Sequence, residues 1–167
     1  LSPSEIIATG YWGVVTKTTD GGSSWTDIST TYEKYLHDAY FFDSNTGIVV
    51  GGYSGTGKIY KTTDGGATWT EITAPKQERL RSILFLNSST GFIVGDDGAI
   101  MKTTDGGNTW VDKSVSEYWD FYDVVFQTTD NGYVLGTGGL AYETTDGGET
   151  WTEMTTPRDY YIYGAEI

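Results

Sequence analysis

The acidic side chains are the residues of this sequence with the most chemistry to offer. Twenty-three Asp and Glu stand among 167 residues, and glycoside hydrolysis needs only two carboxylates at a suitable separation. Acids of this kind are usually solvated turn residues, so we expect no catalytic pair among them. The candidates near expected loops are Asp38, Asp96, Asp97, Asp120, Asp123 and Asp159.

Other combinations of residues that could form a catalytic, metal or phosphate site are missing from the sequence. His37 is the only histidine and cysteine is absent, so neither a zinc site nor a Ser/His nucleophile pair is indicated. No glycine-rich phosphate loop stands between a strand and a helix. We therefore expect no cofactor, no metal and no catalytic residue, and a non-enzymatic function is favoured.

The net charge of −13 limits the partners. An acidic protein repels the phosphates of nucleic acid, so nucleic-acid binding is not expected. No apolar run approaches the 18 residues of a membrane-spanning helix, so we expect no membrane insertion.

One short phrase recurs four times. TTDGGSSWT (18–26) returns as TTDGGATWT (62–70), TTDGGNTWV (103–111) and TTDGGETWT (144–152). A catalytic loop is rarely needed four times in a small protein, whereas a structural repeat is. The phrase therefore marks building blocks about 41 to 44 residues long, measured between its aspartates.

The shared pattern Thr-x-Asp-x-Gly-x-x-Trp spans residues 18–25, 62–69, 103–110 and 144–151. Glycine allows the positive φ of a tight turn, and an aspartate side chain accepts backbone N–H groups there. The tryptophan is expected to bury its ring between repeats. A calcium loop would need more carboxylates, so we assign structural roles to Asp20, Trp25, Asp64, Trp69, Asp105, Trp110, Asp146 and Trp151.

Between these phrases the sequence alternates short apolar runs with turns. In the second repeat the runs are YLHDAYFF (35–42), IVVGG, KIYKT and WTEI, and no run shows helical periodicity. The first run is nearly all apolar and is expected to be buried on both faces. Four antiparallel strands per repeat predict an all-β fold, a β-propeller of four blades, and a single domain over residues 1–167.

The two ends of the sequence fit together. DYYIYGAEI (159–167) resembles a first strand, and LSPSEIIATG (1–10) resembles a turn and a second strand. We expect residues 160–166 to pair with residues 5–9, which would close a ring of four blades. The alternative is an arc of a larger propeller, completed by a second copy.

The phrases carry a family resemblance. They resemble the Asp-box, or bacterial neuraminidase repeat, and GGYSGTGKIYKTTDGGATW and VGDDGAIMKTTDGGNTW are similar to the photosystem II stability/assembly factor-like propellers. That family usually has seven blades, so four is a departure. The sialidase members hold their substrate with three arginines from separate blades, but here Arg79 and Arg81 share one loop and only Arg158 remains.

The loops between strands two and three and between blades are expected on one face. Trp12 and Trp119 lie there and are the only tryptophans outside the four phrases. Exposed aromatics beside the few arginines are typical of a contact surface. The predicted binding residues are Tyr11, Trp12, His37, Arg79, Arg81, Tyr118, Trp119, Arg158, Tyr160 and Tyr161.

The sequence therefore predicts a non-catalytic binding or assembly module that engages a protein or glycan partner through this face. The alternative is a carbohydrate-active domain, either lectin-like or a glycoside hydrolase. A homo-oligomer, or membership of a larger assembly, stays open. An extracytoplasmic location is expected, as a secreted, cell-surface or phage-particle protein.

Overall fold

The chain folds into four antiparallel sheets, which we number blades 1 to 4 in chain order. The computed structural model describes residues 2–32, 34–115, 118–154 and 163–164. Within each sheet the strands are neighbours in chain order. Blade 1 holds β1 (Ile6–Thr9), β2 (Val15–Thr18) and β3 (Thr26–Asp27); blade 2 holds β4 (Leu36–Phe41), β5 (Gly47–Tyr53), β6 (Thr56–Thr62) and β7 (Thr70–Ile72); blade 3 holds β8 (Leu80–Phe85), β9 (Gly91–Gly95), β10 (Ile100–Thr103) and β11 (Val111–Asp112); blade 4 holds β12 (Phe121–Phe126), β13 (Gly132–Gly136), β14 (Ala141–Thr144) and β15 (Thr152–Glu153).

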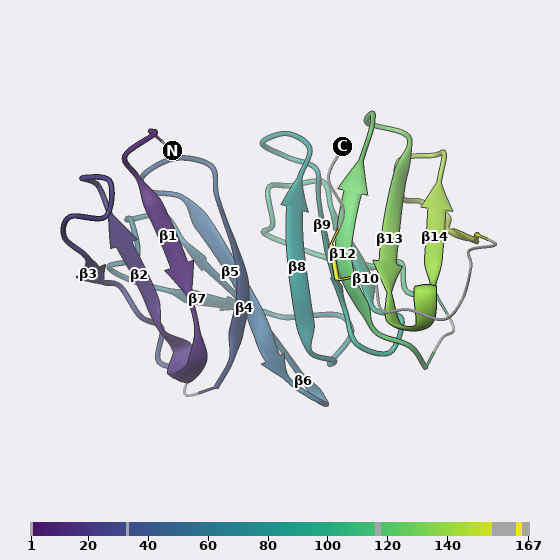
Figure 1. The fold of residues 1–167 in the computed structure, drawn as a ribbon, viewed down its shortest axis with the longest axis horizontal. Helices are drawn as coiled ribbons and strands as arrows, with labels where there is room; N and C mark the ends of the chain where they lie inside the picture. Colours follow the sequence, from purple (N-terminus) through teal and green to yellow (C-terminus); the bar gives the residue numbers. More distant parts are fainter. Residues whose placement is uncertain (1, 33, 116–117, 155–162, 165–167) are drawn as a thin grey trace.

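The predicted repeat of four antiparallel strands is confirmed in blades 2, 3 and 4. The first strands are neighbours, with β4 packed beside β8 and β8 beside β12. The blades therefore follow one another in a curved row, with blade 1 at one end and blade 4 at the other (Figure 1). Two three-residue 3-10 turns, η1 (Tyr11–Gly13) and η2 (Thr137–Gly139), are the helical segments of the described residues, and neither could cross a membrane.

Ring closure is not decided by the described residues. Among them, β1 pairs with β2 alone, and blade 1 has three strands where the other blades have four. The predicted pairing of residues 160–166 with residues 5–9 rests mainly on positions outside the described ranges. Closure within one chain therefore stays a prediction.

The repeated phrase forms the same hydrogen-bonded turn in every blade. In blade 2 the Thr62 hydroxyl donates to Asp64 Oδ1 at 2.8 Å and accepts the Gly66 N–H at 2.9 Å. The other oxygen of Asp64 accepts the Thr68 hydroxyl at 2.6 Å. The corresponding bonds lie within 0.2 Å in the other three blades. The carboxylate therefore satisfies donors of its own turn, as a structural role requires.

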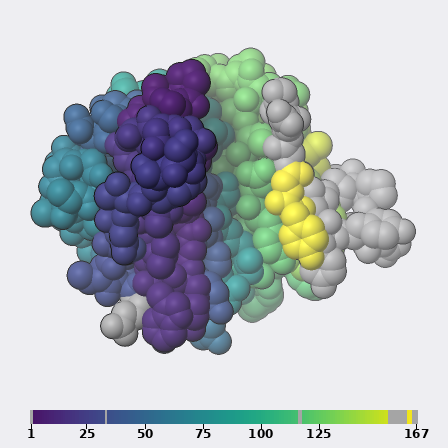
Figure 2. Space-filling model, turned by 60° about the vertical axis from the view of Figure 1, so that its left-hand side comes forward, coloured from purple at the N-terminus to yellow at the C-terminus, as the bar shows by residue number. Residues whose placement is uncertain are grey.

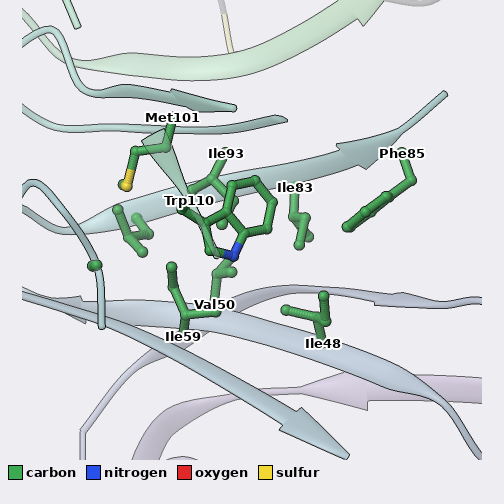
Figure 3. Close-up of a cluster of buried hydrophobic side chains, with 10 residues drawn as sticks. Ile48, Val50, Ile59, Ile83, Phe85, Ile93, Met101 and Trp110 are labelled. Carbon is green, nitrogen blue, oxygen red and sulfur yellow. The ribbon is translucent and has the colours of Figure 1, made fainter. Parts of the chain in front are cut away.

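The tryptophans of the phrase in blades 2, 3 and 4 face the preceding blade. Trp110 of blade 3 is 7% exposed, and it packs against Ile48 and Ile59 of blade 2; Figure 3 shows its indole among these side chains. Trp69 of blade 2 donates its Nε1–H to the Ile28 carbonyl of blade 1 at 2.7 Å. All four rings were expected to be buried: Trp110 is buried and Trp69 and Trp151 are partly buried, but the expectation is wrong for Trp25, which is 47% exposed. No described blade precedes blade 1, so no described sheet covers this ring.

Lysines reinforce the same junctions. Lys61 on β6 donates to the Gly106 carbonyl and to Asn108 Oδ1 in the next blade, both at 2.8 Å. Lys102, at the same place on β10, donates to Glu149 Oε1 at 2.6 Å. Blades 2 and 3 are thus each bonded to the following blade through their third strand.

In blades 2, 3 and 4 the second strand is more buried than the first. All residues of β9 are buried, as are all those of β5 except Tyr53, whereas only Leu36 of β4 is buried. The expectation of a fully buried first strand was wrong because first strands form the inner edge of the row. A register shift near the start of β4, β8 and β12 also interrupts their pairing.

Candidate functional site

The predicted binding residues that the structure describes gather where the loops between strands two and three meet the loops between blades. We call this surface the loop face and define it by Tyr11, Trp12, Tyr35, His37, Tyr53, Arg79, Arg81, Tyr118, Trp119 and Tyr122. Backbone bonds hold the two sets of loops together: Gly13 N–H donates to the Lys34 carbonyl at 2.8 Å, and Gly98 N–H to the Trp119 carbonyl at 2.8 Å. The loop face is therefore anchored at both ends by its backbone.

Trp12 has an unusual backbone. Its φ is 63°, in the left-handed region, where a bulky side chain is an outlier. The equivalent turns of the other blades place Gly138 at φ 65° and Asp97 at φ 52°. Glycine adopts this conformation without strain. Blade 1 thus holds a tryptophan where the backbone favours glycine, and the ring is 58% exposed.

Aromatic rings continue from Trp12 into blade 2. The Tyr11 ring lies 4.8 Å from the Trp12 ring and 4.5 Å from the Tyr35 ring, measured between centroids. Tyr35 in turn stacks on the His37 imidazole at 5.7 Å, with 9° between the ring planes. These contacts join three of the predicted residues into one platform.

A pocket of about 480 Å³ opens beside this platform. Pockets of this size, with apolar walls and a few polar groups, are typical of ligand sites. Lys58 is held at its rim by Glu71 at 2.6 Å. The pocket is lined by Tyr11, Tyr32, Lys34, Tyr35, Tyr53, Ser54, Thr56 and Lys58.

The two described arginines of the site, Arg79 and Arg81, share the carboxylate of Asp96. Arg81 pairs with Asp96, and its other nitrogen donates to Asp120 Oδ2 at 3.0 Å. Arg79 Nε lies 3.5 Å from Asp96 Oδ2 and is buried without a hydrogen bond to any described residue. A buried unsatisfied donor is uncommon in native structures, which marks Arg79 as a group with bonding capacity to spare.

The arginines also face aromatic rings and the histidine. The Arg79 guanidinium lies 5.6 Å from the centre of the Tyr53 ring, and that of Arg81 4.6 Å from the Tyr122 ring. Partial burial, together with the charges of Arg79 and Arg81, lowers the pKa of His37. His37 is therefore expected to be neutral at physiological pH and to offer stacking and hydrogen bonding.

Trp119 completes the surface at its blade 4 end. Its ring is 51% exposed, and it precedes Asp120, the partner of Arg81. Tyr118 is 94% exposed. The predicted residues Arg158, Tyr160 and Tyr161 lie outside the described residues.

Sequence reasoning missed the tyrosines that line the pocket. Tyr32, Tyr35 and Tyr53 stand in loops that were assigned to this face, but they were not named as binding residues. The loop before blade 2 carries two tyrosines, and the adjacent loop between strands carries a third. That coincidence was the signal available.

The candidate acids of a glycosidase are tied into the fold. Asp38 Oδ2 accepts the Ile83 N–H at 2.9 Å, and it shares the Ser82 hydroxyl with Asp123 at 3.3 Å each. Burial is the main effect that raises the pKa of Asp38, and the charge of Asp123 raises it further by a smaller amount. Asp96 and Asp120 form ion pairs with Arg81. Asp159 lies outside the described residues. No group of three or more acidic, histidine or cysteine side chains among the described residues could hold a metal ion.

The sheets, the repeated turn and the junctions define the class of the protein, an Asp-box β-propeller. A family model described as "Photosynthesis system II assembly factor YCF48" matches residues 17–118. That is more than half of the chain, and the chain belongs to this family. No curated protein sequence matches it.

Solved structures show the same fold at low identity. YCF48 bound to D1 peptide is 17% identical with a TM-score of 0.55, covering 91% of this chain and 77% of that one. YCF48 from Cyanidioschyzon merolae is 16% identical with a TM-score of 0.52, covering 90% and 69%. An ancestral GH74 enzyme is 20% identical with a TM-score of 0.76, covering 95% of this chain but 24% of its own. The row of blades therefore matches one part of that larger molecule.

Proposed function

We propose that this protein is a non-catalytic binding module that engages a segment of a protein partner through the loop face. The observation that carries the proposal is Trp12, a half-exposed indole on a backbone that favours glycine. Strained residues cluster at functional sites, where the strain is retained for what the side chain does. A solvent-facing tryptophan kept under strain is best explained by a contact that it makes.

The chemistry of the surface fits a polypeptide. Tyrosine, tryptophan and arginine are the side chains that dominate protein interfaces, and the loop face combines all three. The pocket beside Tyr35 and Tyr53 could take an apolar or aromatic side chain. Lys34, which lines the pocket, could take a carboxylate or carbonyl oxygen.

The family supports the same direction. Its description is that of an assembly factor, and one structural relative is a YCF48 bound to a peptide. Assembly factors act through protein partners, so a peptide is the first ligand to test on this chain. We also propose an extracytoplasmic location, the one expected from the sequence.

The test is binding to an array of short peptides that includes the D1 peptide, followed by titration of the best sequence. Trp12→Ala and Trp119→Ala are each expected to weaken binding about tenfold or more, as loss of a hot-spot side chain does. The matched control is Val111→Ala, because Val111 is 57% exposed but lies on β11, away from the loop face. Equal weakening by all three variants would contradict the proposal.

The alternative is a carbohydrate ligand, favoured by the aromatic platform and by the likeness to a xyloglucanase. The GH74 xyloglucanase from Xanthomonas campestris is 13% identical with a TM-score of 0.70, covering 91% of this chain and 28% of its own. Aromatic rings stack on sugars as readily as on side chains. Binding of xyloglucan oligosaccharides that Trp12→Ala abolishes, with no peptide bound, would replace the peptide proposal with a lectin-like one.

A further inference from the structure

Blade 1 has an inner edge without a partner among the described residues. Its sheet begins at β1, whereas the sheets of blades 2, 3 and 4 each have one more strand on that side. An open strand edge presents N–H and C=O groups that readily accept another strand. Blade 1 therefore lacks an inner strand in the described part of the chain.

Blade 1 also has an uncovered side face. At each of the three internal junctions, an apolar side chain from the preceding blade fills the space beside the second glycine of the phrase. A Cβ built on Gly107 would lie 2.3 Å from Ile48, and one on Gly148 would lie 2.3 Å from Phe92. At Gly22 of blade 1 the only neighbour within 4 Å is its own Trp25. Figure 2 looks onto this end of the row, with blade 1 in front.

The other end of the row carries the opposite feature. Asp38 of β4 accepts a backbone N–H from Ile83 of the next inner strand. Counted from the tryptophan of each phrase, Tyr163 and Gly164 correspond to Arg81 and Ser82 in the aligned repeats. The structure places these two residues beside β12, because the Tyr163 ring lies 5.0 Å from the Tyr122 ring. A Cβ on Gly164 would stand 3.5 Å from Asp123 Oδ2.

Tyr163 and Gly164 thus occupy the place of the next inner strand after blade 4. This is the element that blade 1 lacks, but blades 1 and 4 stand at opposite ends of the row (Figure 1). The row also matches about a quarter of a larger propeller enzyme at a TM-score of 0.76. A similar arrangement of blades therefore occurs as one part of a larger molecule.

We propose that two copies of this chain associate head to tail and close a ring of eight blades. The segment around Tyr163 and Gly164 of each copy completes blade 1 of the other, so the two joints are identical. Trp25 of each copy then packs on blade 4 of its partner, as Trp69, Trp110 and Trp151 pack on the blades before them. The joint continues the junction that the chain already builds three times.

The repeat fixes the register of the exchanged strand. In the internal blades, Asp38 pairs with Val50, Ser82 with Val94, and Asp123 with Leu135. Gly164 aligns with the first member of these pairs and Thr9 with the second. Gly164 of one copy is therefore placed opposite Thr9 of the other.

Disulfide trapping tests this register directly, because the natural chain has no cysteine. Cα atoms of directly opposed antiparallel residues lie about 4.5–5.5 Å apart, within reach of a disulfide. The chain carrying both Thr9→Cys and Gly164→Cys is expected to oxidise to a covalent species of twice the 18.3 kDa chain mass. Ala8→Cys with Gly164→Cys is the control, because a shift of one residue turns the side chain to the other face.

A second measurement uses no crosslink. The unmodified chain is expected to sediment with twice the chain mass, and Trp25→Lys to shift it toward the single mass, because it places a charge in the joint. Trp119→Lys, an equally exposed tryptophan on the loop face, is expected to leave the mass unchanged.

Three results would overturn the proposal. They are a single-chain mass for the unmodified protein, an oxidised Thr9→Cys, Gly164→Cys chain that stays at one chain mass, and a mass above two chains. The second would show that the four blades close within one molecule.

Discussion

The two edges of the blades use similar backbones in opposite ways. At one edge the repeated phrase makes the same turn four times, with the same threonine hydroxyl bonded to the same aspartate oxygen. At the loop face, one left-handed turn position holds Trp12, Asp97 and Gly138. At the edge that forms the junctions, the same residues recur in every blade. At the edge proposed to face a partner, the residues at one repeat position differ between blades. Function in this fold is thus expected where repeated backbone carries unlike side chains.

The strongest test of this contrast compares one glycine position at a filled junction and at the free end. Gly107→Ala is expected to lower the free energy of unfolding by about 2–5 kcal/mol. Alanine at φ 78° is strained, and its Cβ overlaps Ile48. At Gly22 the φ is 94° and no described blade precedes blade 1, so Gly22→Ala introduces backbone strain but no overlap. It is expected to lower the free energy of unfolding by only about 1–2 kcal/mol.

Urea unfolding of both variants, under conditions in which the chain is a monomer, gives the comparison. Equal losses would mean that the junctions contribute nothing at this position. The contrast between filled and free faces would then be unsupported.

Acid is expected to loosen the repeated turns. Hydrogen bonds from Thr68, the side chain first, lower the pKa of Asp64 to about 2, and the equivalent bonds from Ser24 and Thr109 do so for Asp20 and Asp105. Because the pKa is lower in the folded state, this stabilisation is complete above the ordinary value near 3.8 and is lost as pH falls toward 2.

Thermal unfolding followed from pH 5 to pH 2 checks this prediction. Asp64→Asn removes one titrating group and should make the fall in melting temperature shallower. If the variant and the natural chain fell with the same slope, the turn carboxylates would not be the groups that titrate.

The smallest effect on stability is expected at Trp12. Trp12→Ala and Trp12→Gly both remove the indole, but only glycine relieves the left-handed backbone. Trp12→Gly should be more stable than Trp12→Ala by about 1 kcal/mol, while both lose partner binding to the same extent. Unfolding and peptide titration on the two variants separate strain from contact, and equal stabilities would contradict a strained Trp12.

The strands, the repeated turns and the loop face could be predicted from sequence because their signals are local. Glycine, aspartate and tryptophan recur at fixed spacing, and turns separate the runs. The turns GYWG (10–13), GDDG (95–98) and GTGG (136–139) can also be compared in the sequence. Their third residue takes a positive φ, so the comparison indicates the strain at Trp12.

Contacts between blades could not be predicted in this way. The pocket forms where Tyr11 of blade 1 meets Tyr53 of blade 2, and nothing in either loop specifies their separation. The serine shared by Asp38 and Asp123 depends on register shifts in three strands. The exposure of Trp25 follows from the absence of a described blade before blade 1, although its phrase reads like the other three.

The lysines of the third strands make the repeats non-interchangeable. Lys61 meets the Asn108 side chain, and Lys102 meets the carboxylate of Glu149. Lys17 instead donates to the Ser44 carbonyl at 2.6 Å, because Ala67 stands where the later phrases carry an acceptor. If the repeats of 41 to 44 residues were rearranged in another order, every turn would be kept. The lysines would then no longer face the partners that they bind in the natural order. The order of these lysine–partner pairs along the chain therefore determines which repeat can follow which.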